Sequence, residues 1–168
     1  MINTSRLLVI VDGSSAGQRA VEYVAVLIGR RKGFRICLAH LLPPLPAELL
    51  EFGGVENPTE ETREQAQLHA EQKRYRRAEK QKDRGMLEAA TDMLHKAGVP
   101  RSAIEMRFWS LPAGRDPADE VLEMAQARRC KTVVVGRRTP SWIRELLGGD
   151  LAEKLVRRGE GITVWVVE

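Results

Sequence analysis

The chain has few of the residues on which disulfide frameworks and membrane spans depend. Only two of its 168 residues are cysteines. Cys37 and Cys130 are far apart in sequence and adjoin apolar runs, which predicts buried free thiols in a reducing compartment. The apolar run that ends before Asp12 is too short for a signal peptide, and no apolar segment is long enough to span a bilayer. We therefore expect a cytoplasmic protein with no membrane segment.

The usual motifs of catalysis and of metal binding are also missing. The three histidines lack the close spacing of a metal site. There is no Walker-type phosphate loop, and Ser14 and Ser15 have neither a Gly-x-Ser-x-Gly elbow nor an evident histidine partner. Helix capping explains these serines better than nucleophilic catalysis does. We therefore expect no metal site and no enzymatic activity.

The bulk composition is that of an ordinary globular protein. Apolar residues make up 43% of the chain and charged residues 30%. A chain of 168 residues can bury a sufficient core as one domain, so we expect a single domain over residues 1–168. The net charge of +4 permits anionic ligands but does not by itself indicate nucleic acid.

Short apolar runs rich in β-branched residues alternate with segments of helical periodicity. Ser14 or Ser15 can cap the first helix and Gly33 closes it, while Asp116 and Pro117 begin a later helix. The expected strands are Arg6–Val11, Phe34–Leu41, Ile104–Trp109, Thr132–Val135 and Ile162–Val167. This alternation predicts an α/β fold, a three-layer α/β/α sandwich around a five-stranded parallel sheet.

The last part of the chain, Lys131–Val167, has the pattern of a strand, a glycine-bearing loop, a short helix and a final strand. Gly136 ends the first of these strands where a loop should leave the carboxyl edge of the sheet, the usual place for ligands in such folds. Gly148 and Gly149 lead into a helix that begins near Asp150. Two glycine turns, one of them at a helix N-terminus, are the parts from which an anion site is built.

A charged helical insertion separates the second and third strands. Thr59–Ala97 has the pattern of one long helix or of two helices end to end, with core-facing residues only in its second half. The first half, about 59–84, should be solvated, should project, or should contact a partner. Residues 73–84 form a basic cluster that could bind nucleic acid or an acidic protein. The acids Glu79 and Asp83 within it favour a solvated, internally paired helix face, so we do not expect nucleic-acid binding.

Four segments together resemble the universal stress protein family. They are LLVIVDGSSAGQRAVEYV (7–24), LAHLLPP (38–44), GRDPADEVLEMAQARRCKTVVVG (114–136) and LLGGDLAEKLVRRGEGITVWVV (146–167). The resemblance implies a Rossmann-like, adenine nucleotide alpha hydrolase-like fold with strand order 3-2-1-4-5 and a ligand crevice between strands 1 and 4. It also implies a homodimer through the last strand, 162–167, where the alternative is a monomer whose own helices shield the edge.

The resemblance also supplies the candidate nucleotide positions. In nucleotide-binding members the fourth strand is followed by glycine, two residues, glycine, nine residues, then glycine and a serine or threonine. Adenine and ribose contacts fall at the ends of strands 1 and 2, where Asp12 can accept from a ribose hydroxyl. The candidate positions here are Val11, Asp12, Leu41, Gly136, Arg137, Arg138, Thr139, Gly149, Asp150 and Leu151.

Two departures from the family pattern change the chemistry of this site. Thr139 replaces a glycine of the family pattern. A threonine strains the backbone there if the position needs a positive φ. Asp150 stands for the serine or threonine; it caps the helix equally well, but its carboxylate should repel a phosphate. Arg137 and Arg138 can bind phosphate or pair with Asp150.

These features predict a regulatory or stress-response binding module with weak or absent ATP binding and no resident cofactor. Two alternatives remain open. The first is a nucleotide-dependent switch that binds AMP or ATP, and the second is a nucleic-acid-associated protein that uses the basic helix 73–84. A bound adenine ligand would indicate the first alternative, and salt-sensitive nucleic-acid binding the second.

Overall fold

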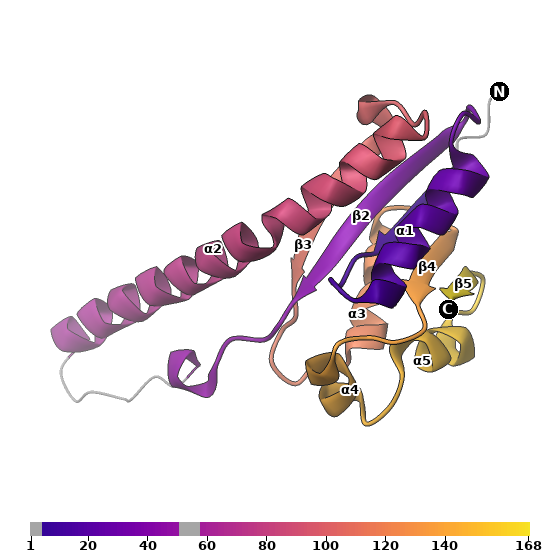
Figure 1. Ribbon diagram of the computed structural model, residues 1–168. Helices are drawn as coiled ribbons and strands as arrows, with labels where there is room; N and C mark the ends of the chain where they lie inside the picture. The colour runs from indigo at the N-terminus through magenta and orange to yellow at the C-terminus, as the bar shows by residue number, and fades with distance from the viewer. Residues whose placement is uncertain (1–4, 51–57) are drawn as a thin grey trace.

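The structure is a computed structural model that describes residues 5–50 and 58–168. Strands and helices alternate along the chain as the sequence predicts (Figure 1). The strands are β1 (Ser5–Ile10), β2 (Phe34–Leu42), β3 (Ile104–Ser110), β4 (Thr132–Gly136) and β5 (Thr163–Val167). The α-helices are α1 (Ser15–Ile28), α2 (Pro58–Lys96), α3 (Pro117–Ala127), α4 (Ser141–Leu147) and α5 (Leu151–Arg158), with short 3-10 helices at η1 (Ala47–Leu49) and η2 (Arg101–Ala103).

The strands form one parallel sheet in the order β3-β2-β1-β4-β5. This confirms the predicted α/β class and the strand order 3-2-1-4-5. β1 and β4 are the neighbours at the centre, where Val9 pairs with Val134 in register. The side chains of both residues are fully buried, as expected of central parallel strands covered on both faces.

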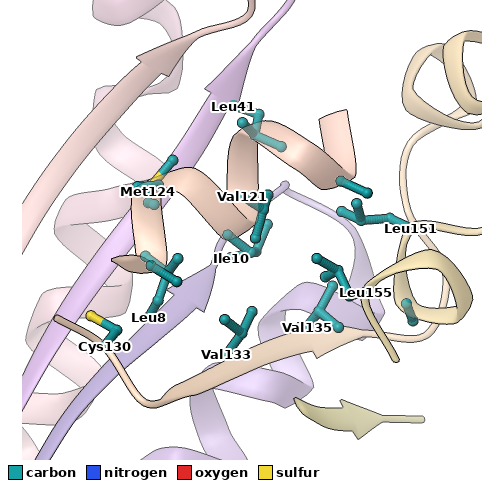
Figure 2. Packing of buried hydrophobic residues seen from close by; sticks show 14 of the residues in the cluster. Leu8, Ile10, Leu41, Val121, Met124, Cys130, Val133, Val135, Leu151 and Leu155 are labelled. Atoms are coloured by element: carbon teal, nitrogen blue, oxygen red, sulfur yellow. The ribbon is translucent and has the colours of Figure 1, made fainter. Parts of the chain in front are cut away.

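Each face of the sheet has its own hydrophobic core because successive strand residues point to opposite sides. On one face, Leu8 and Ile10 pack with residues of α3, α4 and α5, among them Val121 and Leu155 (Figure 2). On the other face, Val9 and its alternate neighbours pack with α1 and with the second half of α2. The molecule is therefore the three-layer sandwich that the sequence predicts.

α2 is a single continuous helix, the first of the two possibilities left open by the sequence. Its second half is held on the sheet by Leu87 and Leu94, both fully buried. Its first half continues past the carboxyl edge of the sheet and projects from the body (Figure 1). There, the side chain of Gln72 donates to the carbonyl of Leu49, at 2.7 Å. Every helix in the described ranges is too short or too polar to span a lipid bilayer.

Two sequence-based expectations about helices were wrong. The first helix does not continue to Gly33; α1 ends at Ile28, where Gly29 is the C-cap and donates to the carbonyl of Ala25. The segment after Gly136 is not only a loop, because it contains α4. Between β2 and α2 the chain forms the short 3-10 helix η1.

Candidate functional site

The carboxyl ends of β1 and β4 lie side by side, and the chain leaves them toward opposite faces of the sheet. From β1 it enters α1 on one face, and from β4 it continues into α4 and α5 on the other. A crevice opens where two neighbouring parallel strands send their loops in opposite directions, and ligands of open α/β sheets bind in that crevice. The candidate residues Asp12, Gly136 and Thr139 all belong to these two loops.

Asp12 organises the turn between β1 and α1. Its Oδ1 accepts from the backbone N–H of Ser14, at 2.9 Å, and from the Ser14 hydroxyl, at 2.6 Å. The Ser14 Oγ accepts in turn from the N–H of Gly17, at 2.9 Å, so Ser14 is the N-cap that was predicted as one of two options. The second carboxylate oxygen, Oδ2, is buried and has no hydrogen-bond partner among the described residues. Asp12 therefore has one buried acceptor oxygen at the carboxyl end of β1 that the described residues do not satisfy.

Gly136 is required by packing against α1. A Cβ atom at Gly136 would lie 2.5 Å from the carbonyl carbon of Ala16 and 2.7 Å from the nitrogen of Gly17. Such distances are too short for any side chain. Gly136, the first glycine of the family pattern, thus permits the close approach of the first turn of α1.

The loop after β4 is fastened to the same turn. The Ser14 hydroxyl lies 3.2 Å from the carbonyl oxygen of Arg138. Thr139 is 4% exposed, and within residues 5–50 and 58–168 its Oγ1 has no hydrogen-bond partner. Among the described non-glycine residues only Arg129 has a positive φ, so Thr139 does not adopt the strained conformation considered from the sequence. Threonine is therefore accommodated at this position without backbone cost.

Asp150 caps α5, which confirms the capping predicted from the sequence. Its Oδ1 accepts from the N–H of Ala152 at 2.8 Å. The turn before it is made by Gly148, which has a φ of +61° and ends α4. Glu153 lies one turn into the helix and pairs with Arg157, at 2.6 Å. The carboxylate of Asp150 thus occupies one of the N-terminal amides of α5, that of Ala152.

Arg137 does not pair with Asp150. Its guanidinium pairs with the side chain of Glu168, and its backbone N–H donates to the carbonyl of Val167 at 2.7 Å. Arg137 and Asp150 do line the same surface depression of about 430 Å³, between α5 and β5, together with the apolar side chain of Val166. Arg138 is exposed.

The remaining candidate positions lie in the two cores. Leu41 and Leu151 are 2% and 0% exposed and pack in the cluster beneath α3, where both are visible in Figure 2. Val11 is buried on the opposite face and also lines a pocket of about 220 Å³ between the start of α1 and Met86 of α2. The candidate residues therefore divide among the crevice, the α5–β5 depression and the cores.

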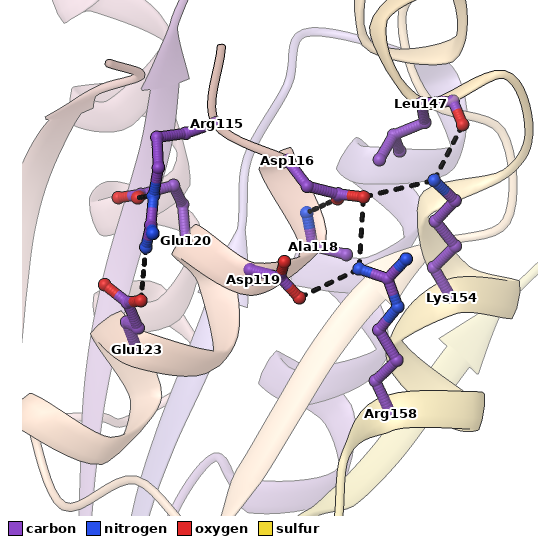
Figure 3. A network of polar contacts seen from close by, with 9 residues as sticks. All are labelled: Arg115, Asp116, Ala118, Asp119, Glu120, Glu123, Leu147, Lys154 and Arg158. Carbon is purple, nitrogen blue, oxygen red and sulfur yellow. Dashed lines mark hydrogen bonds and ion pairs between the residues drawn. The ribbon is translucent and has the colours of Figure 1, made fainter. Parts of the chain in front are cut away.

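A polar network holds α4 and α5 against α3 (Figure 3). Asp116 caps α3 by accepting from the N–H of Ala118, at 2.8 Å. The Asp116 Oδ2 also accepts from Lys154, at 3.2 Å, and from Arg158, at 3.1 Å. Lys154 donates further to the carbonyl of Leu147, at 2.7 Å, the last residue of α4. Burial disfavours the charge on Asp116, but the Ala118 N–H and Lys154 outweigh it and hold the pKa of that carboxyl below its ordinary value.

The contacts of His40 at the carboxyl edge of the sheet were not predicted from the sequence. The ring of His40, at the end of β2, contacts the carbonyl of Val11 through Nδ1, at 2.6 Å, and Asp83 of α2 through Nε2, at 3.1 Å. Asp83 thus pairs with the sheet and not with the arginines of its own helix. No sequence pattern joins residues 43 positions apart, so only the fold could reveal this contact.

The fold is that of an open α/β sheet, a class of proteins whose ligand sites usually lie at the carboxyl edge of the sheet. More narrowly, the chain belongs to the universal stress protein family, whose family model matches residues 3–168. No protein with a curated description matches the chain in sequence.

Solved structures of the same family share this fold. A universal stress protein from Burkholderia pseudomallei has 17% identity and a TM-score of 0.63, covering 98% of this chain and 96% of the other. One from Archaeoglobus fulgidus in complex with dAMP has 19% identity and a TM-score of 0.54, with both chains covered fully. One from Arabidopsis thaliana with AMP bound has 17% identity and a TM-score of 0.54, covering 97% of this chain and 90% of the other.

Proposed function

We propose that this chain is a regulatory binding module that acts without a catalytic step of its own and binds ATP weakly or not at all. The observation that carries the proposal is the hydrogen bond that the Asp150 carboxylate accepts from the Ala152 amide at the N-terminus of α5. A helix N-terminus attracts phosphate because its amides are unpaired and partly positive. Here a carboxylate already accepts from one of those amides.

Charge makes the competition stronger. Two unit charges about 4 Å apart at an effective dielectric of about 20 repel by roughly 4 kcal/mol, before further screening by water. Arg137, which lines the same depression as Asp150, is paired with Glu168. Its charge is therefore not fully available to compensate a phosphate chain beside Asp150. Arg138 is exposed and keeps its charge, but a single exposed guanidinium gains little from a phosphate in water.

The alternative is a switch that binds an adenine nucleotide, and one observation favours it. The buried Oδ2 of Asp12 has no hydrogen-bond partner in the described part of the chain, and a ribose hydroxyl would satisfy it. The relatives from Archaeoglobus fulgidus and Arabidopsis thaliana hold dAMP and AMP, which carry one phosphate. A monophosphate places less charge near Asp150 than a triphosphate does, so any nucleotide bound here should be AMP-like.

Calorimetry with ATP, ADP and AMP tests this proposal on the wild type and on Asp150→Ser. Serine caps a helix about as well as aspartate, so the variant removes the charge and keeps the cap. We expect no ATP binding by the wild type at micromolar concentrations and a gain of at least about tenfold in the variant, since removal of the repulsion favours the complex.

The control is Asp92→Ser, which removes an exposed aspartate elsewhere, and should leave ATP binding unchanged. Micromolar ATP affinity of the wild type would overturn the proposal. If the wild type binds AMP but neither ADP nor ATP, the nucleotide-dependent switch is favoured over a module that binds no nucleotide.

A further inference from the structure

A second pocket lies at the amino edge of the sheet, opposite the crevice. Its volume is about 250 Å³, and it is bounded by the starts of β1 and β2, by η2, and by the turn that follows α3. Arg6, Arg35 and Arg128 line it, together with the cysteines Cys37 and Cys130. None of these residues was singled out as a ligand-binding residue by the sequence or by the family pattern.

Arg6 and Arg35 lie next to each other, and neither has an acidic partner in the part of the chain that the structure describes. Arg6 and Arg35 are register partners on the paired strands β1 and β2. They point to the same face because Leu8 and Cys37, two residues further along each strand, both belong to the core under α3. Like charges in directly opposed positions destabilise a sheet. Within residues 5–50 and 58–168, neither guanidinium forms an ion pair; Arg6 donates only to the carbonyl of Arg128, at 3.2 Å.

The acid in the pocket lining is already neutralised. Glu105 accepts from Arg128, at 2.8 Å, and pairs with Arg107 as well. The two thiols do not supply negative charge, since burial raises the pKa of Cys37 to about 12 and also raises the pKa of Cys130. The pocket therefore combines uncompensated positive charge with a neutral, largely buried floor.

We propose that this pocket binds a small organic anion, whose phosphate or carboxylate group is held between Arg6 and Arg35. Guanidinium groups bind both kinds of oxyanion through paired N–H donors. An anion in this position would relieve the repulsion between the two adjacent arginines. The volume exceeds that of one or two water molecules, so the uncharged part of the ligand can lie against Cys37 and Cys130. The site is separate from the crevice and does not depend on nucleotide binding.

Titrations followed by two-dimensional ¹H–¹⁵N nuclear magnetic resonance test the proposal, with phenyl phosphate and benzoate as probes. We expect concentration-dependent shifts of the amides of Cys37 and Ser102, and the tighter probe identifies the preferred headgroup. Arg6→Gln and Arg35→Gln should each weaken binding by about tenfold, the usual effect of losing one charged hydrogen-bonding group.

Arg31→Gln is the matched control, because Arg31 is an exposed arginine outside the pocket. It should leave both titrations unchanged. Folding of each variant is checked by its spectrum without probe, so that loss of binding is not confused with loss of structure. Absence of shifts with both probes, or binding that persists in Arg35→Gln and is lost in Arg138→Gln, would overturn the proposal.

Discussion

At the scale of single residues, Asp116 connects three helices through one carboxylate. It caps α3, binds Lys154 and Arg158 of α5, and through Lys154 fixes the end of α4. The pKa of Asp116 is lowered in the folded protein, so its contribution to stability is present above the pKa of the unfolded chain. That contribution is lost as the pH falls through the folded pKa. We therefore expect the free energy of unfolding to decline below about pH 4 partly because of this group.

Urea unfolding of Asp116→Asn between neutral and acid pH measures this contribution. Asparagine keeps the cap but loses the charge, so we expect a loss of about 1 kcal/mol at pH 7, allowing for screening by water, and a flatter pH dependence. Asp92→Asn is the control, since Asp92 forms an exposed pair with Arg101 and should change stability by less. Parallel pH profiles for wild type and Asp116→Asn would show that Asp116 contributes no pH-dependent stability.

The residues that the sequence predicted well are those whose partners are near in the chain. Ser14 caps α1 and Asp150 caps α5 because an N-cap bonds to amides two or three residues ahead. The partner of Arg137 could not be found in this way, because Glu168 comes beside it only when β4 and β5 pair. The uncompensated arginines at the amino edge were missed for the same reason.

At the scale of elements, α2 consists of two halves with different support. The second half buries Leu87 and Leu94 against the sheet, whereas residues 59–82 are exposed or at most half-buried. Local opening is easier where few apolar groups hold the backbone. We expect amides of 59–82 to exchange with deuterium at least about tenfold faster than those of 86–96.

Hydrogen exchange carried out on the intact protein, with deuterium uptake measured by mass spectrometry for each segment separately, checks this expectation. Gln72→Ala should accelerate exchange in the first half further, since it removes the side-chain bond to Leu49. Gln65→Ala, at an exposed position of the same half, is the control and makes the same chemical change. Equal protection along the whole helix would mean that the projecting half is stabilised by contacts other than those described.

Element types were more predictable than element ends. The apolar runs predicted all five strands of the described sheet. The predicted strand ends differ from the observed ones by one residue at most. α4 was missed because it is short and begins after Pro140 without a side-chain cap, so its only signals are Ile143 and Leu147 on one face. The end of α1 was misplaced because the positive charges of 30–32 continue the helical pattern beyond Gly29, where the helix in fact ends.

At the scale of the whole molecule, the unpaired edge of β5 is the surface most suited to association with another chain. β5 is the last strand of the sheet, and its outer backbone groups have no strand beside them among the described residues. α1 covers one face, where Tyr23 packs edge-on against Trp165 with ring centroids 6.0 Å apart. On the other face Val156 and Val166 remain 61% and 41% exposed beside the α5–β5 depression. An apolar edge of this kind favours pairing with another strand.

We therefore propose that two copies associate through β5, and Val166→Lys tests the proposal. A charged side chain on the apolar side of an edge strand blocks strand pairing, so the variant should sediment as a monomer while the wild type sediments as a dimer at micromolar concentration. Leu146→Lys changes a similarly exposed apolar residue outside β5 and should leave the dimer intact. A wild type that sediments as a monomer would contradict the proposal. A dimer that survives Val166→Lys would place the interface elsewhere, with the projecting half of α2 as the next surface to test.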